Sequence, residues 1–166
     1  MQKLNINSGN NINNINQDNF KKFDGAKILQ EAEQHCVFCS IINHESEQLI
    51  YEDENVVAFK DINQASAKYH MLVCPKKHII NVNYLEKKDI ELLNQIEKIG
   101  QKVIQKLFPG EEYRFGFHKP PMVSVDHLHL HVFVLPIKNN FINLIQYGNL
   151  LHSVQSVRED IQQINK

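Results

Sequence analysis

Three histidines at every second position form the part of this sequence best suited to chemistry. His127, His129 and His131 alternate with aliphatic residues in the segment 127–133. Residues two apart on a β-strand point to the same face, so we expect the imidazoles on one side and the aliphatic side chains on the other. Neighbouring like charges lower the tendency of each imidazole to ionise. A neutral imidazole serves as a nucleophile, a general base or a metal ligand.

Two kinds of reaction fit such a row of histidines. In one, alternating histidines hold a catalytic zinc ion. In the other, one imidazole attacks a phosphorus atom while the others bind phosphate oxygens. Ser124, shortly before the row, can donate to a phosphate oxygen or a leaving group. Asp61 follows an apolar run and is either a turn residue or an acceptor for two ribose hydroxyls. Together these residues favour phosphoryl chemistry and leave zinc open.

The cysteines suggest a second kind of site. Cys36 and Cys39 have the C-x-x-C spacing of a zinc half-site, although the same spacing also occurs in redox proteins. Cys74 lies in an apolar run and is expected only to pack. Three cysteines do not make a disulfide framework, which favours a reducing compartment.

Charge and hydropathy exclude some partners. Eighteen basic and nineteen acidic residues give a formal net charge of -1, so no basic field is present to hold a nucleic-acid backbone. No apolar run reaches the roughly 18 residues of a membrane helix, and no secretory signal is visible. We therefore expect a cytoplasmic or nuclear protein, with neither a membrane nor a nucleic acid as partner.

The elements that must position the histidines can be predicted from periodicity. The first 19 residues contain eight asparagines, and we expect residues 1–34 to form a disordered arm before a domain at 35–166 that includes a C-terminal tail. Apolar spacing of three and four predicts a long helix at 88–108. An α+β fold with a mainly antiparallel sheet follows from this order. The predicted strands are 48–51, 56–60, 69–74, 113–117 and 128–135, with a short helix at 154–164.

The row of histidines resembles the motif of the histidine triad (HIT) superfamily, in which three histidines alternate with apolar residues. Four other stretches resemble the Hint branch of that superfamily, in the same order along the chain. The resemblance spans about residues 35–137 and is greatest to the subfamily of the third histidine triad nucleotide-binding protein, with the aprataxins next. The four stretches are CVFCSII at 36–42, AFKDI at 58–62, YHMLVCPKKHI at 69–79 and GFHKPP at 116–121.

The resemblance implies a HIT-like fold with a five-stranded sheet, and an active site for AMP and its conjugates. His129 would be the nucleophile that forms an adenylyl-histidine, His131 would bind the α-phosphate, and His70 would support them. Ser124 would assist at the phosphate or the leaving group. The glycine-containing segment usual before the triad is absent, so His118 is expected to supply a phosphate contact instead. The remaining nucleotide-binding residues implied by the resemblance are Asp61 and Ile62 for the ribose and adenine, and Phe38, Ile41, Phe59 and Leu72 for the walls of the base pocket.

The resemblance also implies a structural metal and a partner copy. Zinc-binding members of the superfamily complete the cysteine pair with two histidines, which here are His78 and His127. Cys36, Cys39, His78 and His127 are thus the expected ligands of a structural zinc, whereas the reaction itself needs no cofactor. Members of this family are usually homodimers, so we expect a homodimer.

Four functions remain open on the sequence. The first is a hydrolase of adenosine 5'-phosphoramidates, of the adenosine 5'-monophosphoramidase type. The second is the same chemistry on another conjugate, either a dinucleoside polyphosphate or an adenylated DNA end. The third is a purine-nucleotide-binding or scaffold protein without catalysis, and the fourth is a metalloenzyme that uses the three histidines as ligands. The first is the principal prediction.

Overall fold

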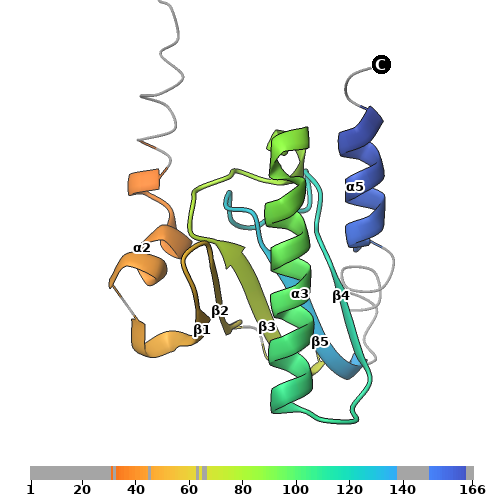
Figure 1. Ribbon diagram of the computed structural model, residues 1–166. Helices are drawn as coiled ribbons and strands as arrows, with labels where there is room; N and C mark the ends of the chain where they lie inside the picture. The colour runs from red at the N-terminus through yellow and green to blue at the C-terminus, as the bar shows by residue number, and fades with distance from the viewer. Residues whose placement is uncertain are drawn as a thin grey trace, which may run out of the picture.

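The centre of the protein is a five-stranded antiparallel sheet (Figure 1). The strand order is β1-β2-β3-β5-β4, and every neighbouring pair is antiparallel. The computed structural model describes residues 31, 33–44, 46–62, 64, 67–137 and 150–163. The strands are β1 (Leu49–Glu52), β2 (Val56–Lys60), β3 (Ala67–Pro75), β4 (Tyr113–Gly116) and β5 (Leu130–Ile137).

The helices lie outside the sheet, and the longest crosses one of its faces (Figure 1). With the sheet, this long helix confirms the predicted fold class. The predicted arm at 1–34 lies almost wholly outside the described residues, as does the segment 138–149. The helices are α2 (Val37–His44), α3 (Ile90–Leu107) and α5 (Val154–Gln163), with single 3₁₀ turns η2 (Ser46–Gln48), η4 (Val82–Tyr84) and η5 (Lys87–Asp89).

Strands β2 and β3 separate two apolar clusters because successive side chains point to opposite faces. Both strands are buried over most of their length, as expected for strands covered on both sides. One set of alternate residues packs with α3, and the other packs with the cysteines and Phe38 around α2. The first set is Val56, Ala58, Met71 and Val73, and the second is Val57, Phe59, Leu72 and Cys74.

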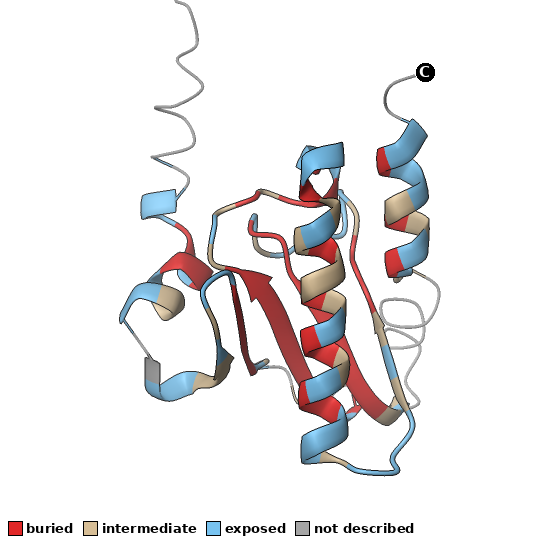
Figure 2. Cartoon of the chain, in the orientation of Figure 1, coloured by how far each residue is buried: buried red, intermediate tan, exposed pale blue. Residues whose placement is uncertain are grey.

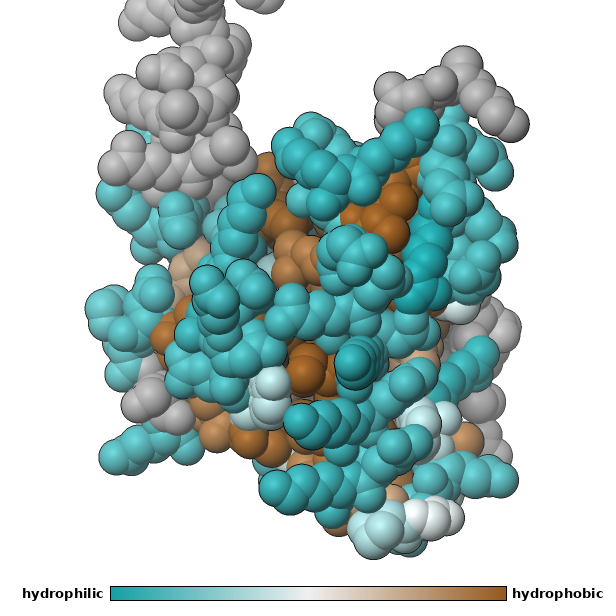
Figure 3. Space-filling model, in the orientation of Figure 1, coloured by the Kyte–Doolittle hydropathy of each residue, from teal (hydrophilic) through white to brown (hydrophobic). Residues whose placement is uncertain are grey.

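Helix α3 packs closely on β3 and β5 through its apolar stripe, whose buried residues face the sheet (Figure 2). A Cβ atom built on Gly100 would lie 3.3 Å from Leu130 Cδ2 and from Val132 Cγ2. The aliphatic side of the histidine segment therefore packs against α3, as predicted. On the solvent side, α3 and its neighbours present mostly hydrophilic residues with apolar patches between them (Figure 3).

The predicted last strand, 128–135, begins and ends two residues too early. Strand β5 begins at Leu130, which pairs with Val73, so two of the three histidines precede the strand. The backbone there follows the loop after β3 instead, since Leu128 N–H donates to the carbonyl of Ile79 at 2.6 Å. The ladder between β3 and β5 ends at the pair of Val73 and Leu130, although β3 itself continues to Pro75.

The C-terminal helix is held to the rest of the domain by apolar packing of Val154, Val157 and Ile161 and by polar contacts. Arg158 of α5 contacts Glu97 and donates a hydrogen bond to Asn94 at 2.9 Å, both on α3. Just before the helix, His152 and Phe117 exchange backbone hydrogen bonds of 2.8 Å and extend the line of β4. No helix in the described part of the chain is both long enough and apolar enough to span a membrane.

Candidate active site and metal cluster

A cavity of 170 Å³ lies on the α2 side of the sheet, between α2, β2 and the histidine segment. This volume is below the range of about 300–1,000 Å³ typical of ligand sites, so a nucleotide would be only partly enclosed. Nine of the ten predicted nucleotide-binding residues line it. These nine are Phe38, Ile41, Phe59, Asp61, Ile62, Leu72, Ser124, His129 and His131.

One side of the cavity is apolar and aromatic. The rings of Phe38 and Phe59 meet edge to face with centroids 5.2 Å apart, and Phe38 meets His129 in the same way at 5.2 Å. Leu72 is buried beside them, whereas Ile62 is fully exposed and lies at the mouth. The wall can therefore receive a planar apolar group, with Ile62 available to cover it.

His129 is held by its own neighbour in the chain. Its Nδ1 lies 2.5 Å from the carbonyl oxygen of His127, which can only accept. Nδ1 must therefore carry the proton, and Nε2 is left with a free lone pair. Burial lowers the pKa of His129, with the neighbouring His118 acting in the same direction, so the imidazole is neutral near pH 7. These are the properties of an imidazole nucleophile.

A second chain of contacts joins three residues from three elements. His70 Nδ1 on β3 lies 3.4 Å from Asp61 Oδ2, at the end of β2. His70 Nε2 lies 3.0 Å from His131 Nδ1, on β5. The Asp61 side chain is 13% exposed and the His70 side chain 0%, so their interaction is little screened by water. This Asp61–His70–His131 chain links the carboxylate in the cavity to the imidazole beside His129.

His131 is surrounded by other aromatic rings. Its ring centroid is 4.8 Å from that of His129 and 4.4 Å from that of His118. Burial lowers the pKa of His131 well below the ordinary value, and the three neighbouring histidines add to the effect. His118 contacts His131, but it is not among the residues that line the cavity. The structure thus brings His118 against His131, and its contact with a phosphate stays a prediction.

The four predicted zinc ligands form one cluster on the far side of Phe38. Their ligand atoms all lie within 4.8 Å of one another, although they come from α2, the loop after β3 and the histidine segment. His127 Nδ1 is 3.4 Å from the sulfur atoms of both Cys36 and Cys39, and His78 Nδ1 is 3.3 Å from Cys39 Sγ. A tetrahedral zinc site has ligand atoms about 3.6 Å apart. The cluster is close to that size.

The protonation chemistry of this cluster also suits a metal. His127 Nε2 lies 2.9 Å from the carbonyl of Pro75, so Nε2 carries the proton and Nδ1 presents a lone pair to the sulfurs. Burial lowers the pKa of His127 to about 4, which keeps it neutral. Burial and the adjacent Cys36 raise the pKa of Cys39 to about 12, so a thiolate there needs a cation. The residues present therefore fit zinc.

His127 joins the cluster to the cavity lined by His129. Its side chain faces the cysteines, and its carbonyl oxygen holds His129 Nδ1. Any group that fixes the side chain of His127 also fixes the acceptor that orients His129.

Some residues at the cavity were not predicted. Val37, Gln48, Lys60 and Val125 also line it. Val37 is on α2, a helix too short for its periodicity to be read reliably, and Gln48 and Val125 are brought in by chain reversals that leave no local signal. Lys60 is the last residue of β2, directly before Asp61.

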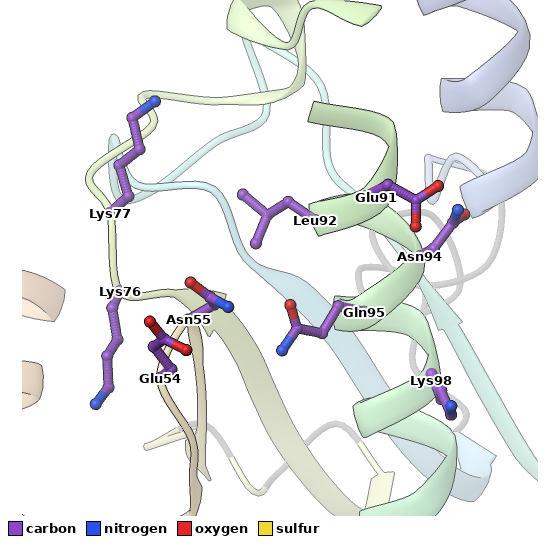
Figure 4. A pocket seen from close by; sticks show the side chains of 9 residues that line it. All are labelled: Glu54, Asn55, Lys76, Lys77, Glu91, Leu92, Asn94, Gln95 and Lys98. Carbon is purple, nitrogen blue, oxygen red and sulfur yellow. The ribbon is translucent and has the colours of Figure 1, made fainter. Parts of the chain in front are cut away.

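A larger hollow of 770 Å³ lies on the α3 side of the sheet, between α3, the β1–β2 turn and the loop after β3 (Figure 4). Charged groups of both signs line it, among them Glu54, Glu91 and Lys98. Lys76 is already paired with Glu52 at 2.6 Å. None of the histidines of the 127–131 segment lines this hollow, so the smaller cavity is the candidate active site.

Comparisons with known proteins agree with this site. Residues 35–145 match the family described as "Scavenger mRNA decapping enzyme C-term binding". The bifunctional adenosine 5'-phosphosulfate phosphorylase/adenylylsulfatase HINT4 of Arabidopsis thaliana is 48% identical over 106 residues, covering 62% of this chain and 72% of that protein. The adenosine 5'-monophosphoramidase HINT3 of Xenopus tropicalis is 35% identical over 129 residues, covering 74% and 84%. Aprataxins match over a shorter stretch.

A solved structure agrees as well. The HIT family hydrolase from Clostridium thermocellum superposes with a TM-score of 0.57 at 36% identity, covering 66% of this chain and 97% of that one. The fold and the histidine segment thus define a protein of the histidine triad superfamily. Within it, the chain belongs to the Scavenger mRNA decapping enzyme C-term binding family, with Hint proteins among its relatives. The predicted superfamily and branch are confirmed.

Proposed function

We propose that this protein hydrolyses adenosine 5'-phosphoramidates or related AMP conjugates through an adenylyl-histidine intermediate. One observation carries the proposal: His129 lines the cavity with Nδ1 bonded to the His127 carbonyl, which leaves Nε2 as the nucleophile. The names of the Xenopus and Arabidopsis relatives, a monophosphoramidase and an adenylylsulfatase, support adenosine nucleotides as the substrate class.

In the first step, His129 Nε2 attacks the α-phosphorus and forms a P–N bond, while the bond from phosphorus to the leaving group breaks. The leaving amine takes up a proton, for which Ser124 at the cavity is the proposed donor. In the second step, water attacks the same phosphorus and gives a proton back to Ser124, the bond to His129 breaks, and AMP is released. Two displacements replace one difficult hydrolysis, and the protein mainly supplies position and hydrogen-bond donors.

The other predicted residues receive roles from their places in the cavity. Asp61 is proposed to accept the ribose hydroxyls, and Phe38, Phe59 and Leu72 to hold the base. His131, in contact with His129, is proposed to bind the α-phosphate, with His70 supporting it through the 3.0 Å contact. His118 is proposed to keep His131 in place from behind, at a ring distance of 4.4 Å.

We propose zinc as a structural metal held by Cys36, Cys39, His78 and His127. Bound there, it would supply no chemistry to the reaction and would tie α2 to the histidine segment. The expected homodimer is part of the same proposal, and sedimentation of the purified protein measures it.

A second leaving group has specific support. The Arabidopsis relative, at 48% identity, is named for adenosine 5'-phosphosulfate, in which sulfate takes the place of the amine. Both substrates pass through the same adenylyl-histidine, so they differ only in the first leaving group. Comparing kcat/KM for the phosphoramidate and the phosphosulfate decides between them.

The test is mass spectrometry of the protein mixed briefly with adenosine 5'-phosphoramidate and quenched with acid-free denaturant, together with AMP release. An AMP adduct on His129 that disappears in His129→Ala supports the proposal. His44→Ala, at the exposed end of α2, is the matched control and should form the adduct normally. AMP binding without adduct or turnover would overturn the proposal in favour of a nucleotide-binding protein.

A further inference from the structure

Gln64 uses its whole side-chain amide on the backbone around the candidate active site. Its Nε2 donates to the carbonyl of Asp61 at 2.6 Å and to the carbonyl of His70 at 2.6 Å. Its Oε1 accepts from the N–H of His70 at 3.2 Å. Three hydrogen bonds from one side chain to two backbone segments form an unusually complete bridge, because a primary amide has two donor hydrogens and one acceptor oxygen.

The bridge stands where the β2–β3 ladder ends. Lys60 and Met71 form the last registered pair of the two strands, and Asp61 N–H still donates to His70 O at 3.1 Å just beyond it. A carboxamide carries the same N–H and C=O groups as a peptide unit. Gln64 therefore acts at this point as a substitute peptide that continues the ladder for one more step.

The two backbone segments joined by Gln64 carry the first two members of the Asp61–His70–His131 chain. The side-chain contacts along that chain are 3.4 Å and 3.0 Å. Such distances persist only while the Cα atoms of Asp61 and His70 keep their separation. A shift of about 1 Å in a catalytic group can cost a factor of about 100 in rate.

We propose that Gln64 is a positioning residue for the hydrolase: its amide fixes Asp61 against His70, and thereby the ring orientation and tautomer of His70 and His131. The expected fall in kcat rests on the proposed function. The expected change in the tautomers of His70 and His131 does not, because it can be measured without turnover. Nothing in the residue type suggests this role, since Gln64 touches the backbone of its neighbours and is not among the residues that line the cavity.

Two isosteric variants separate the hydrogen bonds from the packing. Gln64→Met keeps the length of the side chain and removes all three bonds. Gln64→Glu keeps the acceptor for the His70 N–H, but it removes both donors and places a carboxylate beside two carbonyl oxygens. Gln105→Ala is the matched control, because Gln105 makes one exposed hydrogen bond with Tyr113 at 2.9 Å, at the far end of α3.

The experiment measures the imidazole ¹⁵N chemical shifts of the full-length protein by NMR, and kcat and KM for adenosine 5'-phosphoramidate. In both Gln64 variants, the ¹⁵N shifts of His70 and His131 should move toward the values of a mixture of the two neutral tautomers. The value of kcat should fall about tenfold or more. Gln105→Ala should keep the wild-type values of both. Urea unfolding of each variant identifies any that fails to fold, and the remaining variant then decides.

Unchanged His70 and His131 shifts in a folded Gln64 variant, or a kcat within about twofold of the wild type, would overturn the proposal. A loss of stability with normal shifts would also overturn it, because the amide would then serve only the fold. If the wild type proves to have no turnover, the proposed function fails, and the ¹⁵N shifts still test the bridge independently.

Discussion

The two faces of the central strands have opposite compositions, although the same backbone makes both. Toward α3, the side chains are aliphatic, and their contacts are interchangeable dispersion contacts. Toward α2, the cluster contains the cysteines, and the histidines lie beside it with partners at specific distances. Val73 and its neighbour Cys74 stand on opposite sides of this division.

The difference shows how the protein combines stability with chemistry. A polar group taken from water is costly unless each of its hydrogen bonds is replaced, so the α2 face contributes less to folding per residue than the α3 face. The α3 face must therefore supply most of the stability. Changes on the α3 face should therefore affect mainly stability, whereas changes on the α2 face should also affect activity and the pH dependence of stability.

The largest effect is expected from the metal on the α2 face. Adding a chelator to the zinc-loaded protein should lower the free energy of unfolding by several kcal/mol, a part of the roughly 10–16 kcal/mol measured for structural zinc in small peptides. Activity should fall as well, because His127 loses its anchor and no longer holds His129. Thermal unfolding with and without chelator measures the loss of stability, and AMP release measures the loss of activity. Cys39→Ser should be insensitive to the chelator; equal sensitivity would contradict the metal assignment.

The second effect is acid instability, again confined to the histidine face. Burial lowers the pKa of His127 to about 4, and it also lowers the pKa values of His129 and His131. Their folded pKa values lie below that of the unfolded chain, so the unfolded state binds more protons and stability falls as pH drops below about 6.5. For His127 in chelated protein, the loss reaches about 3 kcal/mol near pH 4, at 1.36 kcal/mol per pKa unit.

Urea unfolding at several pH values between 7.5 and 4.5 measures this slope. His131→Gln should flatten the slope in both zinc-loaded and chelated protein. Val73→Ala, on the α3 face, should lower stability by the same amount at every pH. A pH-independent midpoint in the wild type would show that the imidazoles are not held neutral.

The third effect belongs to the α3 face. Leu93→Ala removes a fully buried side chain of α3 and should lower the free energy of unfolding by about 3 kcal/mol, within the roughly 2–5 kcal/mol range for such changes. The folded fraction should keep the wild-type kcat, since Leu93 packs in the cluster on the α3 side and does not line the cavity. Leu107→Ala, at an exposed position, is the control and should change stability little. A large drop in kcat for folded Leu93→Ala would mean that the two faces are strongly coupled.

The smallest effect tests that coupling directly. Gly100→Ala would place a methyl group 3.3 Å from Leu130 and Val132, which flank His131 in the chain. Overpacking costs about 1–3 kcal/mol, and the better helix propensity of alanine returns about 1 kcal/mol, so the net loss should be about 1 kcal/mol. A small fall in kcat should accompany it. If stability rises instead, the side chains of β5 have moved aside and the packing is looser than the distances indicate.

Part of this arrangement was predictable from local patterns. The period of two at His127, His129 and His131 correctly placed the aliphatic residues against the long helix, and the spacing of apolar residues located that helix. The start of β5 was misplaced, because the pattern continues through His127 while the pairing partner does not. Alternation of polar and apolar residues indicates which face of the sheet a residue occupies. It does not indicate how many residues are paired with the neighbouring strand.

Other features depend on contacts between distant segments. Cys36 and His127 are 91 residues apart, so only the resemblance to a known family suggested that they meet. The contact between His118 and His131 was not predicted, because it depends on the loop between β4 and the histidine segment. Gln64 could not be singled out, since its partners are backbone atoms that every residue possesses.

The double use of His127 has a consequence for substitutions at this position. Its imidazole belongs to the metal cluster, whereas the group that orients His129 is a carbonyl common to all amino acids. Replacing the imidazole should therefore disturb the metal cluster, while the carbonyl that orients His129 remains in the backbone.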